Sequence, residues 1–124
     1  YKHSQYVGAE ACKGCHAHAY NIWKSSKHAS AYPTLKLKNK NKDMNCISCH
    51  VLGWDKKGGF VSTEHTPHML NVQCESCHGP RLEHITQPQK KGPFTKSQDV
   101  CKSCHNPTHS PEFEYSAFWK RIKH

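Results

Sequence analysis

The sequence predicts a mainly α-helical chain in which a few short helices and loops surround bound groups. Only 35% of its 124 residues are hydrophobic, and the mean hydropathy is −0.89. Such values are unusual for a domain that must bury its own side chains. A five-residue motif occurs four times, at intervals too short for four independent domains. We therefore expect a single domain, residues 1–124, organised around whatever the motif binds.

The helical periodicity is clearest in two segments, and a third segment contains a turn. Apolar residues recur at spacings of three and four between Gly8 and Tyr32, which predicts a helix that Pro33 ends. Residues 52–62 surround the turn at 55–59, which predicts a small hairpin. Residues 110–123 predict a second helix, capped at its start by a serine that a proline follows.

The repeated motif is Cys-x-x-Cys-His, the attachment signature of a c-type haem. Two thiols on one turn bond the porphyrin, and the following imidazole binds its iron. The sequence therefore predicts four covalently attached haem c groups. The thioether cysteines would be Cys12, Cys15, Cys46, Cys49, Cys74, Cys77, Cys101 and Cys104, and the proximal iron ligands His16, His50, His78 and His105.

Three other uses of cysteine fit the pattern less well. A disulfide framework gives no reason for histidine to follow the second cysteine four times out of four. Zinc sites built from paired Cys-x-x-Cys units do not need that histidine. Iron–sulfur ferredoxins require cysteine spacings that are absent here.

The formal charge of +9 raises the question of nucleic-acid binding. Four haems would bring about eight negative propionate charges, which offset most of this excess. We therefore predict no nucleic-acid partner and expect redox partner proteins, acidic ones if a basic docking face is used. The densest lysine run, residues 36–42, is interpreted as a solvated loop.

The compartment follows from the cofactor, because covalent haem attachment occurs on the far side of a membrane. We expect a periplasmic or extracellular protein, with the signal peptide absent from the sequence as given. No apolar run approaches 18 residues, so no membrane span is predicted.

Eight histidines lie outside the motifs and are candidates for the sixth position of each iron. A second imidazole gives a closed, low-spin iron suited to electron transfer, whereas an open position permits ligand binding. Surface positions are expected for His18 and His109, and His/Met ligation by Met44 or Met69 is less favoured. The favoured distal ligands are His28, His84, His68 and His124, with His3 and His65 as further candidates.

Several segments resemble the tetrahaem cytochromes of the c-554/c-prime family. The most specific is Cys74-Glu-Ser-Cys-His-Gly-Pro80 with the trailing His84; the others are Tyr6–His16, Trp23–Ala29, Cys46–Gly53 and Met69–Val72. The resemblance implies a mostly helical fold with closely stacked haem pairs. It also implies that His28 caps the third haem and His84 the first. The chain departs from the family at Arg81, where glycine is usual.

The sequence thus predicts an electron-transfer protein, not an enzyme, with four bis-histidine haems. Two alternatives remain. One is a subunit of a polymeric extracellular filament, with a histidine such as His3 completing the haem of another copy. The other is a reductase of nitrogen oxides or similar small molecules with one open haem.

Overall fold

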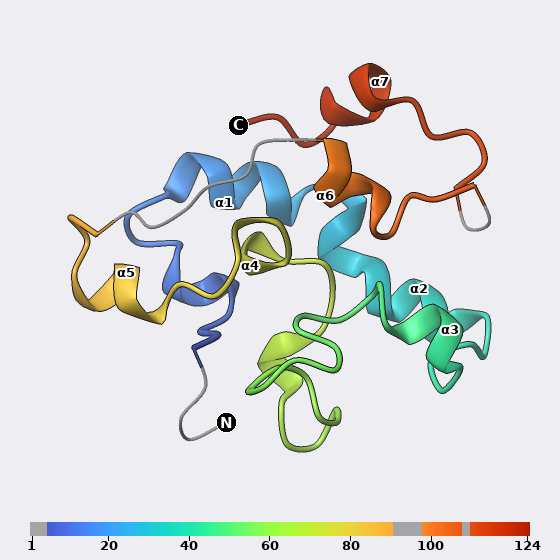
Figure 1. Ribbon diagram of the computed structural model, residues 1–124, viewed down its shortest axis with the longest axis horizontal. Helices are drawn as coiled ribbons and strands as arrows, with labels where there is room; N and C mark the ends of the chain where they lie inside the picture. The colour runs from blue at the N-terminus through green and yellow to red at the C-terminus, as the bar shows by residue number, and fades with distance from the viewer. Residues whose placement is uncertain (1–4, 91–97, 108–109) are drawn as a thin grey trace.

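The computed structural model describes residues 5–90, 98–107 and 110–124, and shows short helices joined by loops (Figure 1). No strand occurs within these ranges, although an isolated antiparallel bridge joins Val51 to Leu70. The predicted mainly α-helical class is confirmed. The α-helices are α1 (Ala17–Lys24), α2 (Ala31–Leu37), α3 (Met44–Ile47), α4 (Cys74–His78), α5 (Leu82–Thr86), α6 (Gln98–Lys102) and α7 (Tyr115–Trp119); the 3-10 helices are η1 (Ala9–Ala11), η2 (Lys27–Ser30) and η3 (Pro67–Met69).

The first segment differs from the single long helix that its periodicity predicted. It is divided into η1, α1, η2 and α2. Pro33 does not end a helix but lies in the first turn of α2. Proline is tolerated there because the backbone N–H groups of a first turn have no partner within the helix.

The C-terminal helix is shorter than predicted and begins later. Its N-cap is Glu114, whose carboxylate accepts hydrogen bonds from the backbone N–H groups of Ser116 and Ala117. Ser110, the predicted cap, instead lies 3.0 Å from the Nδ1 atom of His105. The side chain that satisfies the first N–H groups sets the start of α7.

A side-chain core surrounds the second motif. Its members are Tyr32, Leu35, Ile47, Val51, Leu52, Phe60 and Met69, of which Leu52 and Met69 have no exposed surface. Backbone hydrogen bonds join Leu52 to both neighbouring segments: its N–H donates to Met69 and its C=O accepts from Phe60. Residues 51–70 therefore form a hydrogen-bonded loop cluster rather than the predicted hairpin.

Two glycines allow this cluster to close. The backbones of Gly53 and Gly59 approach so closely that a Cβ atom on Gly59 would lie 1.9 Å from the carbonyl oxygen of Gly53. Gly53 also has a positive φ of 70°, a backbone conformation that residues other than glycine seldom adopt. The turn at residues 53–59 thus holds the chain tightly against the core.

The elements are spread along the molecule. Helices α2 and α3 lie at one end of its long axis, α5 lies at the other, and α4 is near the middle (Figure 1). Each attachment motif is thus carried on a short helix or turn, at a different place along the chain.

Candidate haem sites

Each Cys-x-x-Cys-His motif forms a single helical turn. In the first motif the His16 N–H donates to the Cys12 carbonyl at 2.9 Å, and in the fourth His105 donates to Cys101 at 2.8 Å. Helix α4 is itself the third motif. One turn places the two thiols and the imidazole on neighbouring faces, as attachment to one porphyrin requires.

The thiols of different motifs lie near one another. A hydrogen bond with the Cys74 thiol, together with burial, raises the pKa of Cys12. Burial, a nearby charge on Cys49 and a hydrogen bond with that thiol raise the pKa of Cys104 to about 12. The first motif is therefore near the third and the second near the fourth, while Cys77 of the third motif is also near Cys101 and Cys104 of the fourth.

Three proximal histidines each have a second imidazole nearby. The ring centres are 6.4 Å apart for His16 and His84, 6.2 Å for His28 and His105, and 6.1 Å for His78 and His124. These pairs join distant segments of the chain. Three of the four favoured distal candidates are thus placed beside a proximal ligand.

These separations fit a metal held between two rings. Imidazole nitrogens bind metals at about 2.0–2.1 Å and lie about 1.1 Å from their ring centre, so two opposed rings have centres about 6.3 Å apart. The observed 6.1–6.4 Å matches this spacing at all three sites. The residues present therefore fit a six-coordinate haem iron.

The second nitrogen of several rings is also arranged for ligation. The Nδ1 atom of His50 lies 2.7 Å from the Ala31 carbonyl, that of His84 lies 3.0 Å from the Lys90 carbonyl, and that of His124 lies 2.9 Å from the Ile122 carbonyl. A carbonyl at Nδ1 fixes the tautomer and leaves Nε2 free to bind a metal. Burial lowers the pKa of His28, His78 and His105, which favours the neutral imidazole that metals bind.

The second motif differs from the other three. Among the described histidines, none has its ring opposed to that of His50 in this way. The favoured candidate His68 is exposed and lies beside Gly8. The Nδ1 atom of His65 is hydrogen-bonded to the Ser62 hydroxyl at 2.9 Å.

The remaining candidates divide between core, surface and undescribed parts of the chain. Met69 is fully buried in the side-chain core, whereas Met44 is 70% exposed. His18 is exposed, as predicted for a surface residue. His3 and His109 lie outside the described residues.

The alternative sites for cysteine find no support in the described part of the chain. No disulfide joins any two of the eight cysteines. Within the described residues, no three His, Cys, Asp or Glu side chains converge to hold a metal ion directly, as a zinc site would require.

Sequence reasoning missed a clamp that joins the first and third motifs. Glu75, only 2% exposed, accepts hydrogen bonds from the backbone N–H groups of Val7, Gly8 and Arg81. The Gln73 side chain accepts from the Ala9 N–H at 2.8 Å. An available signal was the acidic residue between the two cysteines of the third motif, where the first and fourth motifs have lysine.

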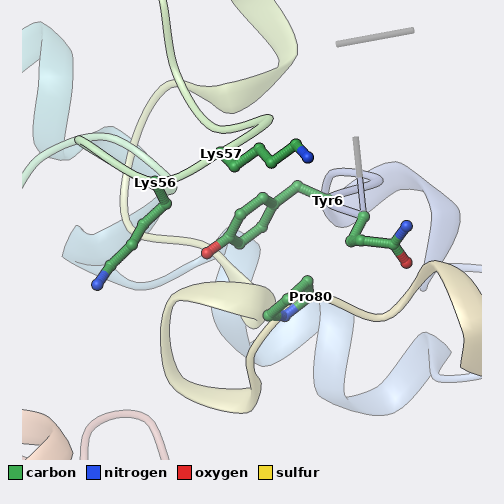
Figure 2. A pocket seen from close by; sticks show the side chains of 5 residues that line it. Tyr6, Lys56, Lys57 and Pro80 are labelled. Atoms are coloured by element: carbon green, nitrogen blue, oxygen red, sulfur yellow. The ribbon is translucent and has the colours of Figure 1, made fainter. Parts of the chain in front are cut away.

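Tyr6 forms the outer edge of this clamp. Figure 2 shows its ring between Lys56 and Lys57 on one side and Pro80 on the other, where these residues and Gln5 line a shallow pocket. A Cβ atom on Gly53 would lie 3.1 Å from the Tyr6 ring. The segment before the first motif is thus packed against the turn at residues 53–59.

Comparison with known proteins decides the family. The sequence profile described as cytochrome c554 and c-prime matches residues 11–79, which include the first three motifs. The chain belongs to this family. It is also similar to cytochrome c-554 of Nitrosomonas europaea, with 32% identity over an alignment covering 78% of this chain and 51% of that protein.

The chain spans about half the length of this curated cytochrome c-554 relative. Solved structures show the same fold. The reduced state of cytochrome c554 from Nitrosomonas europaea matches with a TM-score of 0.69 at 24% identity, covering 97% of this chain and 84% of that chain. The outer cell wall cytochrome OcwA matches with a TM-score of 0.53 at 17% identity, covering 82% of this chain and 37% of that chain.

Family membership and the eight motif cysteines together establish four covalently bound c-type haems. The protein is a multihaem cytochrome. Bound haem supplies one-electron chemistry; the chain supplies the thiols, the imidazoles and the packing that hold it. None of the described helices is long and apolar enough to cross a membrane.

Proposed function

We propose that the chain is an exported electron carrier whose haems pass electrons among themselves by tunnelling. Its family, its four attachment motifs and the contacts between motifs support this function. We infer one domain over residues 1–124, because ring pairs link its early and late segments. Export follows from the site at which c-type haems are attached.

The distal ligands proposed for the first, third and fourth haems are His84, His124 and His28. The observation that carries this assignment is the spacing of 6.1–6.4 Å between each ring and a proximal histidine. The family resemblance implied the third haem for His28. Its ring lies beside His105 of the fourth motif, so we assign it to the fourth haem.

Contacts between thiols support an arrangement of the haems in two pairs. The Cys12–Cys74 contact favours a pair formed by the first and third haems, and the Cys49–Cys104 contact favours one formed by the second and fourth. A short distance between porphyrins within each pair would allow rapid electron exchange.

A second candidate function concerns the second haem alone. Among the described residues, His50 has no opposed imidazole, in contrast to the four bis-histidine haems that the sequence predicted. An iron with one protein ligand can take a small molecule such as a nitrogen oxide in its open position. This observation favours three closed irons and one open iron.

The test is electron paramagnetic resonance of the oxidised protein, with carbon monoxide titration of the reduced protein. We expect three low-spin haems, one high-spin haem and one equivalent of bound carbon monoxide. Replacing His84, His124 or His28 by alanine should each convert one further haem to high spin, whereas His18→Ala should not. Unchanged spin states in those three variants would refute the ligand assignment, and four low-spin haems without carbon monoxide binding would refute the open second haem.

An acidic redox partner is proposed to dock at the turn between α2 and α3. Lys36, Lys38, Lys40 and Lys42 are all exposed there, and Leu37 is 85% exposed among them. This turn leads directly to Cys46 of the second haem site, so a partner bound here would be near an entry point for electrons. Its charge fits an acidic surface.

Charge reversal tests this docking surface. With a plant-type ferredoxin as acidic partner, Lys38→Glu combined with Lys40→Glu should slow electron transfer on the order of tenfold at low ionic strength. The difference should vanish at high salt. The matched control is Lys120→Glu combined with Lys123→Glu, and equal slowing in both variants would contradict a local surface.

Sedimentation of the holoprotein tests association with other copies of the chain.

A further inference from the structure

The hydrogen-bonded clamp around Glu75 lies between the first and third attachment motifs. Glu75 lies between Cys74 and Cys77, and Cys74 contacts Cys12 of the first motif. Because each of these sulfurs would be bonded to a porphyrin, the carboxylate would lie near the attachment points of two different haems. The second and fourth motifs have no glutamate at the corresponding position.

The hydrogen bonds of Glu75 reach both sides of the contact. The Val7 N–H donates to both carboxylate oxygens at 3.0 Å, and the Gly8 N–H donates to Oε1 at 2.7 Å. The Arg81 N–H donates to Oε2 at 3.0 Å. Val7 and Gly8 lead into the first motif, whereas Arg81 follows the third, so one carboxylate fixes the position of both.

All of these hydrogen bonds come from backbone N–H groups, which can only donate, so the Glu75 oxygens act as acceptors in each. Backbone N–H donors stabilise the charged form of a carboxylate. Among the described residues the structure shows one ion pair, which joins Lys90 to Glu83. Glu75 therefore has no cationic partner among these residues. At 2% exposure, water screens this charge far less than it screens a surface charge.

Neighbouring groups respond to this charge. Glu75 lies close enough to Cys12 for its charge to add to the rise in the pKa of this thiol before haem attachment, after a hydrogen bond with Cys74, burial and the charge on Cys74. Burial and then Glu75 raise the pKa of Tyr6. A negative charge on Glu75 would likewise act on the positive charge of an iron held by the first or the third motif.

We propose that Glu75 is a shared positioning residue for the first and third haems, which joins their motifs and, through its buried negative charge, lowers the reduction potentials of these two haems. A ferric haem carries one more positive charge than a ferrous haem. A fixed anion therefore stabilises the oxidised form and makes reduction less favourable. The hydrogen bonds described for Glu75 do not involve the second or the fourth motif, although Cys77 of the third motif lies near Cys101 and Cys104 of the fourth.

The inference rests on the electron-transfer function but not on the assignment of distal ligands. Its test follows the haem methyl resonances of the intact four-haem protein by nuclear magnetic resonance during a redox titration, which reports each haem separately. In Glu75→Gln, which keeps the shape of the side chain and removes its charge, the potentials of the first and third haems should shift upward. Those of the second and fourth should change much less.

Glu10→Gln is the matched control. Glu10 also lies close to the first motif, but it is exposed and accepts a hydrogen bond from the Tyr20 hydroxyl. Removing its charge should shift the potential of the first haem far less than Glu75→Gln does. Equal shifts in the two variants, or no shift in Glu75→Gln, would overturn the proposal.

Glu75→Asp separates charge from position, and it serves alone if Glu75→Gln does not yield a protein with four haems. The shorter side chain keeps the charge near the same two haems while weakening the hydrogen bonds. Their potentials should remain close to those of the unaltered protein. A clear rise of both potentials in Glu75→Asp would show that the charge does not set them.

Discussion

Residues 31–70 and residues 98–124 each carry one attachment motif, yet they are held together differently. The first region contains the whole side-chain core, including the fully buried Leu52 and Met69. In the second, no residue whose side chain is described is buried. Its contacts gather instead around His105, whose ring lies 4.9 Å from that of Phe113 and 5.4 Å from that of Phe118.

This difference teaches what a haem contributes to the fold. In residues 31–70, side chains bury one another and the haem adds to an existing core. In residues 98–124, the rings around a proximal histidine are the centre of the region, so the porphyrin itself must supply the buried apolar surface. The stability of the two regions should therefore depend on different components.

Removing the fourth haem should have the largest effect. We expect Cys101→Ser combined with Cys104→Ser to leave three haems and to increase hydrogen exchange in residues 98–124 roughly tenfold or more. Exchange in residues 31–70 should stay close to that of the unaltered protein. Mass spectrometry of peptides measures both, with Ser103→Ala as the control within the same motif. Retained protection in residues 98–124 would show that this region has a core of its own.

A substitution in the side-chain core should have an intermediate effect, and it should act on residues 31–70 rather than on residues 98–124. Leu52→Ala should lower the free energy of unfolding by about 3 kcal/mol, because the cavity lies among fully packed neighbours. The same truncation at half-buried Ile122 should cost less than about 1 kcal/mol. Guanidinium unfolding of both variants measures the difference. Val61→Ala, at a residue 59% exposed, is the control, and equal losses at Leu52 and Ile122 would remove the distinction.

The smallest effect concerns acid pH and the start of α7. Hydrogen bonds from the backbone N–H groups of Ala117 and Ser116 lower the pKa of Glu114. Its contribution to stability is therefore present above the ordinary carboxyl pKa of 4.5 and is lost as the pH falls through the lowered value. Hydrogen exchange at residues 115–119 should rise over that range, while Glu114→Gln should show the faster exchange already at neutral pH. An acid response unchanged in Glu114→Gln would assign it to another group.

The cofactor and the fold class were predictable because covalent attachment leaves a local signature. Cys12, Cys15 and His16 must share one turn, so their spacing in the chain is fixed. Helix boundaries were less predictable. Periodicity extended one helix through residues 8–32, but the chain breaks into separate helices. The break before Ala31 coincides with hydrogen bonds that join Ala31 and Tyr32 to His50 and Asn71, which are distant in the sequence.

Distal histidines were only partly predictable, since a partner ring can come from any segment that folds past the haem. Chain position and the family resemblance suggested His28 and His84, whereas position alone suggested His124 and also His68, which the structure places beside Gly8. The role of Glu75 depends on backbone N–H groups as distant as Val7. A local sequence pattern cannot predict a hydrogen bond between residues so far apart in the chain.

The imidazole pairs also bear on how the chain acquires its fold. They join residues that are 68, 77 and 46 positions apart: 16 with 84, 28 with 105, and 78 with 124. These three intervals overlap, so no motif can complete its pair within its own stretch of chain. Contacts of such high sequence separation slow folding. The surroundings of these three haem sites must therefore form together, late and cooperatively.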